Sequence, residues 1–377
     1  MSKIEDIENP KIPEFGEYIR QGEPSMRQRA ENWRTAIGLQ AVDGLTTSDY
    51  LQETARRNIE GEISLDEAHD LIHGYYKKRA AHDEPIDEDE SEADRVATNI
   101  SRILASQTLA FNTNGLISLH RRIFDGVFKH AGKLRTYDIT KREWVLHDDT
   151  VNYLNWEDLR AALDYDIEKE RAFSYVGIDT EKMIQHVSDF VSGIWQIHPF
   201  CEGNTRTTAV FTILYLRSIG FDVENDMFAK HSWYFRNALV RANYRNARMG
   251  VDYSPEYLQR FFRNLLLGEQ WDLRSRYLYL NPPAEWQHQP NLSATPTSTK
   301  KGSPISSPIS SPISSRRTSD LIIAMIKENP VISTSAMAER IGISKRGLIK
   351  QTNRLQQAGL IKRVGSPKSG HWEIIEK

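Results

Sequence analysis

The segment HPFCEGNTRT, which spans residues 198–207, decides how the rest of the sequence is interpreted. Before it, apolar residues recur at three- and four-residue steps from Val187 to Ile197, and a second apolar run begins at Val210. That spacing predicts two buried amphipathic helices joined by the quoted segment. The segment is therefore a polar junction inside a mainly α-helical core.

The residue types of this junction suit the handling of phosphate. His198 can accept a proton from a hydroxyl near neutral pH, and Glu202 offers the hard oxygen ligand that Mg²⁺ prefers. Gly203 and Asn204 precede a helix, where free N–H groups and the positive end of the helix dipole bind anions. Arg206, one turn further on, can clamp phosphate oxygens. This combination favours a phosphate-transfer site over a chance His-Pro helix break.

The junction resembles the His-x-Phe-x-(Asp/Glu)-Gly-Asn-x-Arg signature of Fic-domain proteins. The resemblance extends over about residues 100–270 and includes GKLRTYDI at 132–139 and SWYFRNALVRANY at 232–244. It implies a protein adenylyltransferase, an enzyme that moves AMP from ATP to a Ser, Thr or Tyr hydroxyl of a target protein or of itself. The implied fold is an all-helical core with a β-hairpin flap.

The resemblance also implies roles for individual residues. His198 is the implied catalytic base, and Glu202 is the implied ligand of Mg²⁺. The implied nucleotide-binding residues are Gly203, Asn204, Thr205, Arg206, Tyr234 and Asn237. For Tyr234 and Asn237, packing within a helix is an equally good interpretation.

Residues 137–151, YDITKREWVLHDDTV, provide the implied flap. Their β-branched and aromatic residues surround polar turn residues, a pattern typical of a short hairpin or extended flap. By resemblance, the flap residues Trp144, Val145 and Leu146 register the backbone of the target protein by strand addition.

Two positions depart from the family pattern. Thr205 replaces the usual small glycine, a change that the start of a helix tolerates. Ala209 stands where a second arginine is expected. In the family that arginine contacts the γ-phosphate and pairs with an inhibitory glutamate. The change at Ala209 leaves open both the choice of nucleotide and the mode of inhibition.

Residues 1–80 resemble the small three-helix antitoxins that block Fic toxins. Serines at the starts and glycines at the ends of the apolar patterns predict three short helices over residues 26–78. Asp43 and Gly44 stand where the antitoxin signature Ser/Thr-x-x-x-Glu-Gly has its inhibitory Glu-Gly, and Glu60-Gly61 is a rival placement. We expect a weakened or rewired brake; the alternative is a segment that only packs against the core.

The chain is expected to continue from a Fic domain at residues 100–281 into a flexible linker. Residues 282–318 are rich in serine and proline and cannot bury enough apolar surface to fold. Residues 319–377 carry ten Lys and Arg against five Asp and Glu, a local charge of +5, and resemble a winged helix-turn-helix, an α+β module. The expected DNA contacts are Lys345, Arg346, Lys350 and Lys368. Some such modules bind proteins instead.

Composition adds broad limits. The net charge of −2 gives no overall attraction to nucleic acid or membranes, and a single cysteine, Cys201, fits a reducing compartment. Without a signal peptide or a long apolar run, the sequence predicts a soluble, cytoplasmic protein with no membrane partner. The leading functional hypothesis is an AMP-transferring enzyme that uses ATP and Mg²⁺. The alternative is a DNA-binding transcriptional regulator whose Fic core senses nucleotide.

Overall fold

In the computed structural model, the chain forms two compact units. The larger unit comprises Met1–Tyr215 and Val223–Lys300, and the C-terminal unit comprises Leu216–Asp222 and Lys301–Lys377. The structure describes residues 13, 15–221, 223, 226–283, 286, 322–323, 325–327, 329–330, 332–341, 348, 352, 355–356, 359–364 and 371–375. The mainly helical prediction is confirmed, since the two strands of the described residues both lie in the C-terminal unit. Within the described part of the chain, no helix has the length and apolarity needed to cross a membrane.

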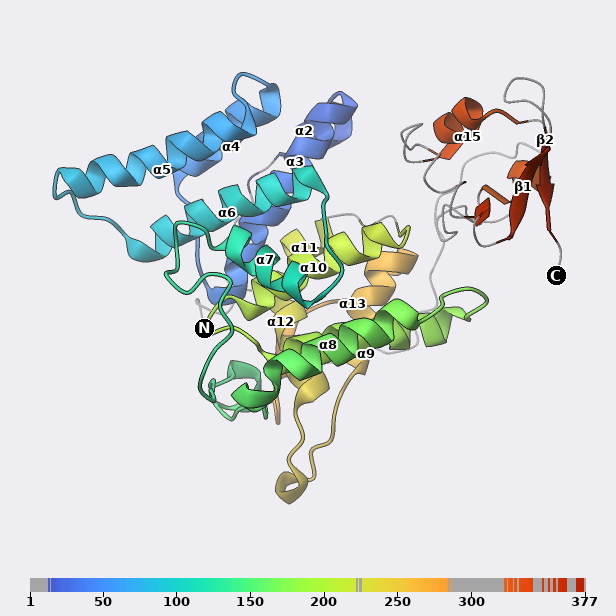
Figure 1. Cartoon of the computed structure of the whole chain (residues 1–377). Helices are drawn as coiled ribbons and strands as arrows, with labels where there is room; N and C mark the ends of the chain where they lie inside the picture. The colour runs from blue at the N-terminus through green and yellow to red at the C-terminus, as the bar shows by residue number, and fades with distance from the viewer. Residues whose placement is uncertain are drawn as a thin grey trace, which may run out of the picture. The chain divides into compact units, whose positions relative to one another are not determined.

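The N-terminal part of the larger unit is helical throughout (Figure 1). Its elements are α2 (Gly16–Gln21), α3 (Pro24–Gly38), the 3-10 helix η1 (Leu39–Asp43), α4 (Asp49–Glu60) and α5 (Leu65–Ala81). Ser48 and Ser64 cap α4 and α5, and Gly44 and Gly61 end η1 and α4 in the left-handed conformation. These boundaries follow the capping chemistry evident in the sequence.

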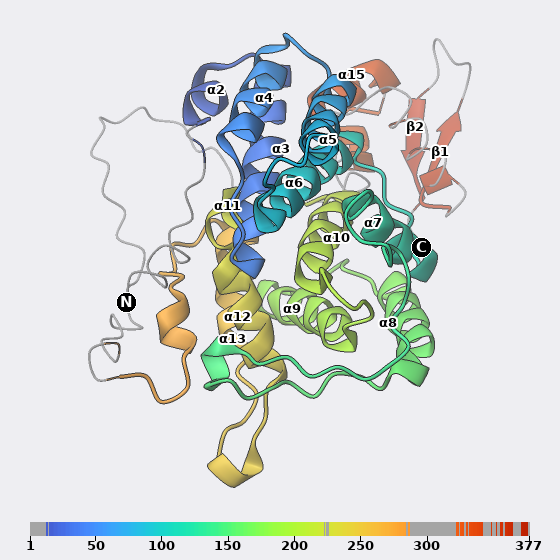
Figure 2. The same ribbon diagram turned by 90° about the vertical axis from the view of Figure 1, so that its left-hand side faces the viewer.

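The helices that follow along the chain include α9 and α10, which flank the junction at residues 198–203 (Figures 1 and 2). They are α6 (Glu88–Ser106), α7 (Thr113–Ile123), η2 (Trp144–Leu146), η3 (Trp156–Asp158), α8 (Leu159–Ala172), α9 (Thr180–Ile197), α10 (Asn204–Ser218), α11 (Asp226–Lys230), α12 (Ser232–Asn243), η4 (Ala247–Met249), α13 (Glu256–Leu267) and η5 (Ser275–Leu278). α12 packs against α9 and α13, and α3 packs against α6 and α11. The N-terminal helices thus belong to the same packed unit as the junction.

The flap residues do not form the expected hairpin. Among residues 137–151 the structure has no strand; Trp144–Leu146 instead form the 3-10 turn η2. Val145 and Leu146 are buried, and the backbone O of Val145 accepts a hydrogen bond from Leu280 N at 3.0 Å. The apolar pattern here serves burial against η5, so this conformation offers no free strand edge at these residues.

The C-terminal unit has its own small core. Its described elements include α15 (Thr334–Ile341) and the antiparallel strands β1 (Ile361–Val364) and β2 (His371–Ile374), with Ile361 paired to Ile374. Ile322, Ile326, Met337, Leu348 and Trp372 are among the apolar side chains that pack together. Lys345, Arg346, Lys350 and Lys368 lie outside the described residues, as does most of the expected linker at 282–318.

Candidate active site

His198 lies at the end of α9 and its side chain is almost fully buried. Its backbone has a φ of 50°, and its Nδ1 lies 3.3 Å from the carbonyl O of Trp195, which assigns the ring proton to Nδ1. Nε2 is buried and has no hydrogen-bond partner among the described residues. Burial, followed by the positive charge of Lys141, holds the pKa of His198 well below its usual value. The imidazole is therefore neutral at pH 7, with Nε2 available to accept a proton.

The side chain of Asn204 stabilises the junction through hydrogen bonds to the backbone of Phe200. Its Oδ1 accepts a hydrogen bond from Phe200 N at 2.9 Å, and its Nδ2 donates to Phe200 O at 2.7 Å. The side-chain amide of Asn204 therefore stabilises the loop, and an anion bound here would contact the backbone of Asn204. Phe200 is buried and its ring stacks on that of His120 with centroids 3.8 Å apart.

Two buried residues to which the sequence assigned no role also position the junction. Arg135 donates from Nε to the carbonyl O of His198 at 2.8 Å, and its backbone N donates to Pro199 O at 2.9 Å. His120 accepts at Nδ1 from Gly132 N at 2.8 Å and contacts the carbonyl O of Glu202 through Nε2 at 3.0 Å. Burial lowers the pKa of His120 to about 4, so it is a neutral donor there. The one sequence signal for Arg135 was its place within GKLRTYDI.

Gly203 fits its position because it has no side chain. Its φ is 74°, and a Cβ built on it would lie 2.1 Å from Cζ of Phe124. The Phe124 ring cannot move away freely. Its centroid lies 4.7 Å from that of the His120 ring and 4.9 Å from Cζ of Arg206.

We expect Gly203→Ala to destabilise the protein more than Gly250→Ala. Gly250 has a similar φ of 66°, but a Cβ at that position would have nothing within 4 Å, so it controls for backbone strain alone. The additional overpacking against Phe124 should cost about 1–3 kcal/mol. The denaturation midpoints of the two variants, followed by tryptophan fluorescence, measure the difference. Equal midpoints would show that Phe124 moves aside without cost.

Glu202 faces solvent at the mouth of the site. Its side chain is 57% exposed, and its Oε2 lies 2.9 Å from Nζ of Lys141, a residue to which the sequence assigned no role. Among the described residues, no group of three or more His, Cys, Asp and Glu side chains could hold a metal ion. One accessible carboxylate nevertheless fits Mg²⁺, which commonly binds one or two carboxylates and takes its other ligands from phosphate and water.

Arg206 is held by the N-terminal helices and by α6. Its Nε lies 2.8 Å from Oδ2 of Asp43, its NH1 donates to Oε1 of Gln40 at 3.1 Å, and its NH2 donates to Oε1 of Glu92 at 2.6 Å. Its side chain is only 2% exposed. The residue expected to clamp phosphate thus already has anionic and amide partners. Gly44 follows Asp43 as the left-handed cap of η1.

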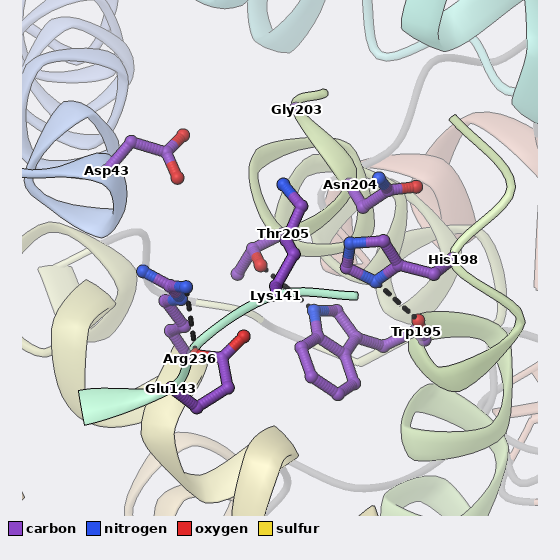
Figure 3. Close-up of a pocket in the computed structure, with 9 residues that line it drawn as sticks. All are labelled: Asp43, Lys141, Glu143, Trp195, His198, Gly203, Asn204, Thr205 and Arg236. Carbon is purple, nitrogen blue, oxygen red and sulfur yellow. Dashed lines mark hydrogen bonds and ion pairs between the residues drawn. The ribbon is translucent and has the colours of Figure 1, made fainter. Parts of the chain in front are cut away.

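A cavity beside His198 contains about 250 Å³ of empty space, part of which is open solvent (Figure 3). Its lining consists of Asp43, Lys141, Glu143, Trp195, His198, Gly203, Asn204, Thr205 and Arg236. Asp43 and Arg236 lie on one side and His198 on the other, with Lys141 between them (Figure 3). Asp43, the last residue of η1, is the one described lining residue that comes from the N-terminal helices.

Other expected nucleotide contacts have structural partners. Thr205 accepts a hydrogen bond at Oγ1 from Trp195 Nε1 at 2.9 Å while lining the cavity. Tyr234 is buried and its hydroxyl donates to Tyr257 O at 3.1 Å. Asn237 donates from Nδ2 to Trp233 O at 3.0 Å. Neither Tyr234 nor Asn237 lines the cavity, so both have packing contacts in this structure.

Comparison with known proteins assigns families to two parts of the chain. Residues 110–216 match the Fic/DOC family, and residues 316–362 match a winged helix-turn-helix DNA-binding family. The expected Fic resemblance and the C-terminal module are thereby confirmed.

Individual relatives are distant. Protein adenylyltransferase VbhT of Bartonella schoenbuchensis is 23% identical over 175 residues, which cover 43% of this chain and 35% of that protein. The chain thus spans about a third of the length of this curated relative. The N-terminal Fic domain of a Bartonella effector protein from Bartonella sp. AR 15-3 is 18% identical, with a TM-score of 0.37 over 47% of this chain and 82% of that one. A Fic family protein from Desulfovibrio desulfuricans is 13% identical, with a TM-score of 0.40 over 100% of this chain and 94% of that one.

Proposed function

We propose that the larger unit transfers AMP from ATP to a Ser, Thr or Tyr hydroxyl of a target protein or of the chain itself. The observation that carries the proposal is the buried, neutral His198, whose Nε2 has no partner among the described residues and faces a cavity at the start of α10. A buried acceptor without a partner is costly unless a ligand supplies a donor. An incoming hydroxyl group supplies that donor.

The reaction follows from this arrangement. His198 Nε2 takes the proton of the target hydroxyl as its oxygen forms a bond to the α-phosphorus. The bond from the α-phosphorus to the oxygen that bridges to the β-phosphate breaks, and pyrophosphate leaves. Glu202 would hold Mg²⁺, which when bound supplies positive charge to the leaving pyrophosphate. The backbone N–H groups at residues 203–205 begin α10 and favour the negative charge of the phosphates.

Incubation of the full chain with Mg²⁺ and ATP labelled at the α-phosphate tests this proposal. Label should become covalently attached to protein. Chelation of Mg²⁺ should prevent the labelling, because it removes the ion that Glu202 would hold.

We further propose that the N-terminal segment restrains this activity. Asp43 and Gln40 of η1 and Glu92 of α6 together occupy Arg206, and Asp43 itself lines the cavity. The family's inhibitory residue pairs with a second arginine, and here that position is Ala209, which is fully buried. In this proposal, the inhibitory contact is therefore made to Arg206 instead of to an arginine at position 209.

A second function is favoured by the C-terminal unit. Its match to a DNA-binding family and its local charge of +5 support binding to duplex DNA. The regulator hypothesis, in which the Fic part senses nucleotide, requires this activity.

We expect the full-length chain to bind duplex DNA with an affinity that falls steeply as salt is raised. The double substitution Lys345→Ala and Arg346→Ala should weaken binding and flatten the log–log salt dependence by up to about 1.8, since each neutralised phosphate contributes about 0.9. Arg160→Ala with Lys182→Ala removes the same charge from exposed sites in the larger unit and is the control. A chain that shifts no DNA at low salt would instead indicate a protein-binding module.

A further inference from the structure

The cavity contains more positive charge than the family motif provides. Position 209 of α10 is an alanine, so it supplies no cation for a distal phosphate. Lys141, which precedes η2, and Arg236 of α12 both line the cavity. Both charges contribute to the lowered pKa of His198, which places them within electrostatic reach of it.

Arg236 is fixed in position by its surroundings. Its NH2 lies 2.9 Å from Oε2 of Glu143, its NH1 donates to the carbonyl O of Val42 at 3.3 Å, and its guanidinium lies over the ring of Trp233 at 5.3 Å. Burial opposes its charge, but Glu143 and Asp43 outweigh burial and raise the pKa of Arg236. The two hydrogen bonds use two of the five donors of a guanidinium, whose planar fork suits phosphate.

Each cation around the cavity now has a carboxylate beside it. Lys141 pairs with Glu202 at 2.9 Å, Arg236 pairs with Glu143, and Arg206 pairs with Asp43. A metal ion held by Glu202 would compete with Lys141 for that carboxylate. If η1 moved away, Arg236 would lose its hydrogen bond to the carbonyl O of Val42, and Asp43 would no longer lie near Arg236. Lys141 would then lose its carboxylate partner, and Arg236 would gain a free donor while keeping its ion pair with Glu143, at a site that receives a polyanion.

We propose that Lys141 and Arg236 form the subsite for the β- and γ-phosphates, in place of the arginine absent at position 209. This inference rests on the proposed nucleotide-transfer function. Arg236 is the main determinant because its side chain is only 19% exposed and projects from α12, whereas Lys141 extends from a loop. The subsite makes the chain selective for nucleotides with terminal phosphates over nucleoside monophosphates.

Binding of ATP and AMP to full-length variants tests the subsite. Arg236→Gln should weaken ATP binding about 10- to 100-fold, the effect of losing a charge-assisted hydrogen bond, and should change AMP binding little. Glu143→Gln should leave ATP binding unchanged or tighten it, because it removes a competing carboxylate. Arg245→Gln, an exposed arginine just beyond α12, is the control and should change neither.

The different effects expected of Arg236→Gln and Glu143→Gln on ATP binding distinguish a phosphate-binding role of Arg236 from a structural role. If each of Glu143→Gln and Arg236→Gln weakens the binding of ATP and of AMP to the same extent, the ion pair only stabilises the flap, and the proposed subsite is overturned. Should Arg236→Gln fail to fold because Glu143 is left unpaired, the double variant Glu143→Gln with Arg236→Gln removes both charges and should still lose ATP selectively. Normal ATP binding by Arg236→Gln overturns the subsite alone. Absence of nucleotide binding by both the wild type and Asp43→Ala overturns the proposed function itself.

Discussion

Replacing His198 with alanine should lower the rate of AMP transfer about 100- to 10,000-fold, the usual contribution of a general base. The reason is that His198 Nε2 is the buried acceptor, unpartnered among the described residues, at the cavity. Nucleotide binding should survive, because the proposed phosphate contacts come from the backbone at the start of α10 and from cations on other elements. The measurement is the initial rate of labelling from α-labelled ATP, together with direct nucleotide binding.

The matched control for this substitution is His82→Ala. His82 is an exposed histidine at the end of α5, so its loss should leave the labelling rate unchanged. Undiminished labelling by the His198→Ala variant would exclude His198 as the base. A variant that neither labels nor binds nucleotide would show a structural role for His198 instead.

Replacing Asp43 with alanine should raise the labelling rate. Asp43 Oδ2 lies 2.8 Å from Arg206 Nε, and losing this ion pair at a buried arginine should shift the restrained state about 10- to 100-fold toward the open state. Part of the restraint should remain, because Gln40 and Glu92 still contact Arg206. Labelling of the variant and of the wild type at equal protein and ATP concentrations provides the measurement.

Three further variants resolve how the restraint works. Asp43→Asn removes the charge but keeps the bulk of the side chain, so it separates electrostatic from steric blocking. Glu92→Gln tests the contact from α6. Asp70→Ala removes a carboxylate that is 84% exposed on α5 and should change nothing. Equal labelling by the wild type, Asp43→Ala and a chain lacking residues 1–80 would leave the N-terminal helices with a packing role only.

Local chemistry made much of this structure predictable. Ser48 and Ser64 begin helices, Gly44 and Gly61 end them, and the apolar spacing before and after residues 198–203 corresponds to α9 and α10. The β-hairpin expected at residues 137–151 is absent because β-branched and aromatic residues around polar turn residues do not distinguish a strand edge from burial against η5.

Contacts between distant parts of the chain were not predictable in this way. Arg206 meets Glu92 across 114 residues, and Arg135 meets the carbonyl of His198 across 63. Lys141 lies in the implied flap and Arg236 lies within SWYFRNALVRANY, but neither had an assigned role, since only the fold brings them to the cavity. Asp43 was expected to reach the phosphate site, but its pairing with Arg206 depends on how η1 lies against the start of α10.

The most direct test of AMP transfer compares labelling from ATP carrying the label at the α-phosphate with labelling from ATP carrying it at the γ-phosphate. The proteins are the full-length wild type, Asp43→Ala, and Asp43→Ala combined with His198→Ala. We expect protein labelled from the α-phosphate but not from the γ-phosphate, strongest in Asp43→Ala and lost in the double variant. Label from the γ-phosphate, or no α-phosphate label in Asp43→Ala with Mg²⁺ and nucleotide bound, would contradict AMP transfer by this site.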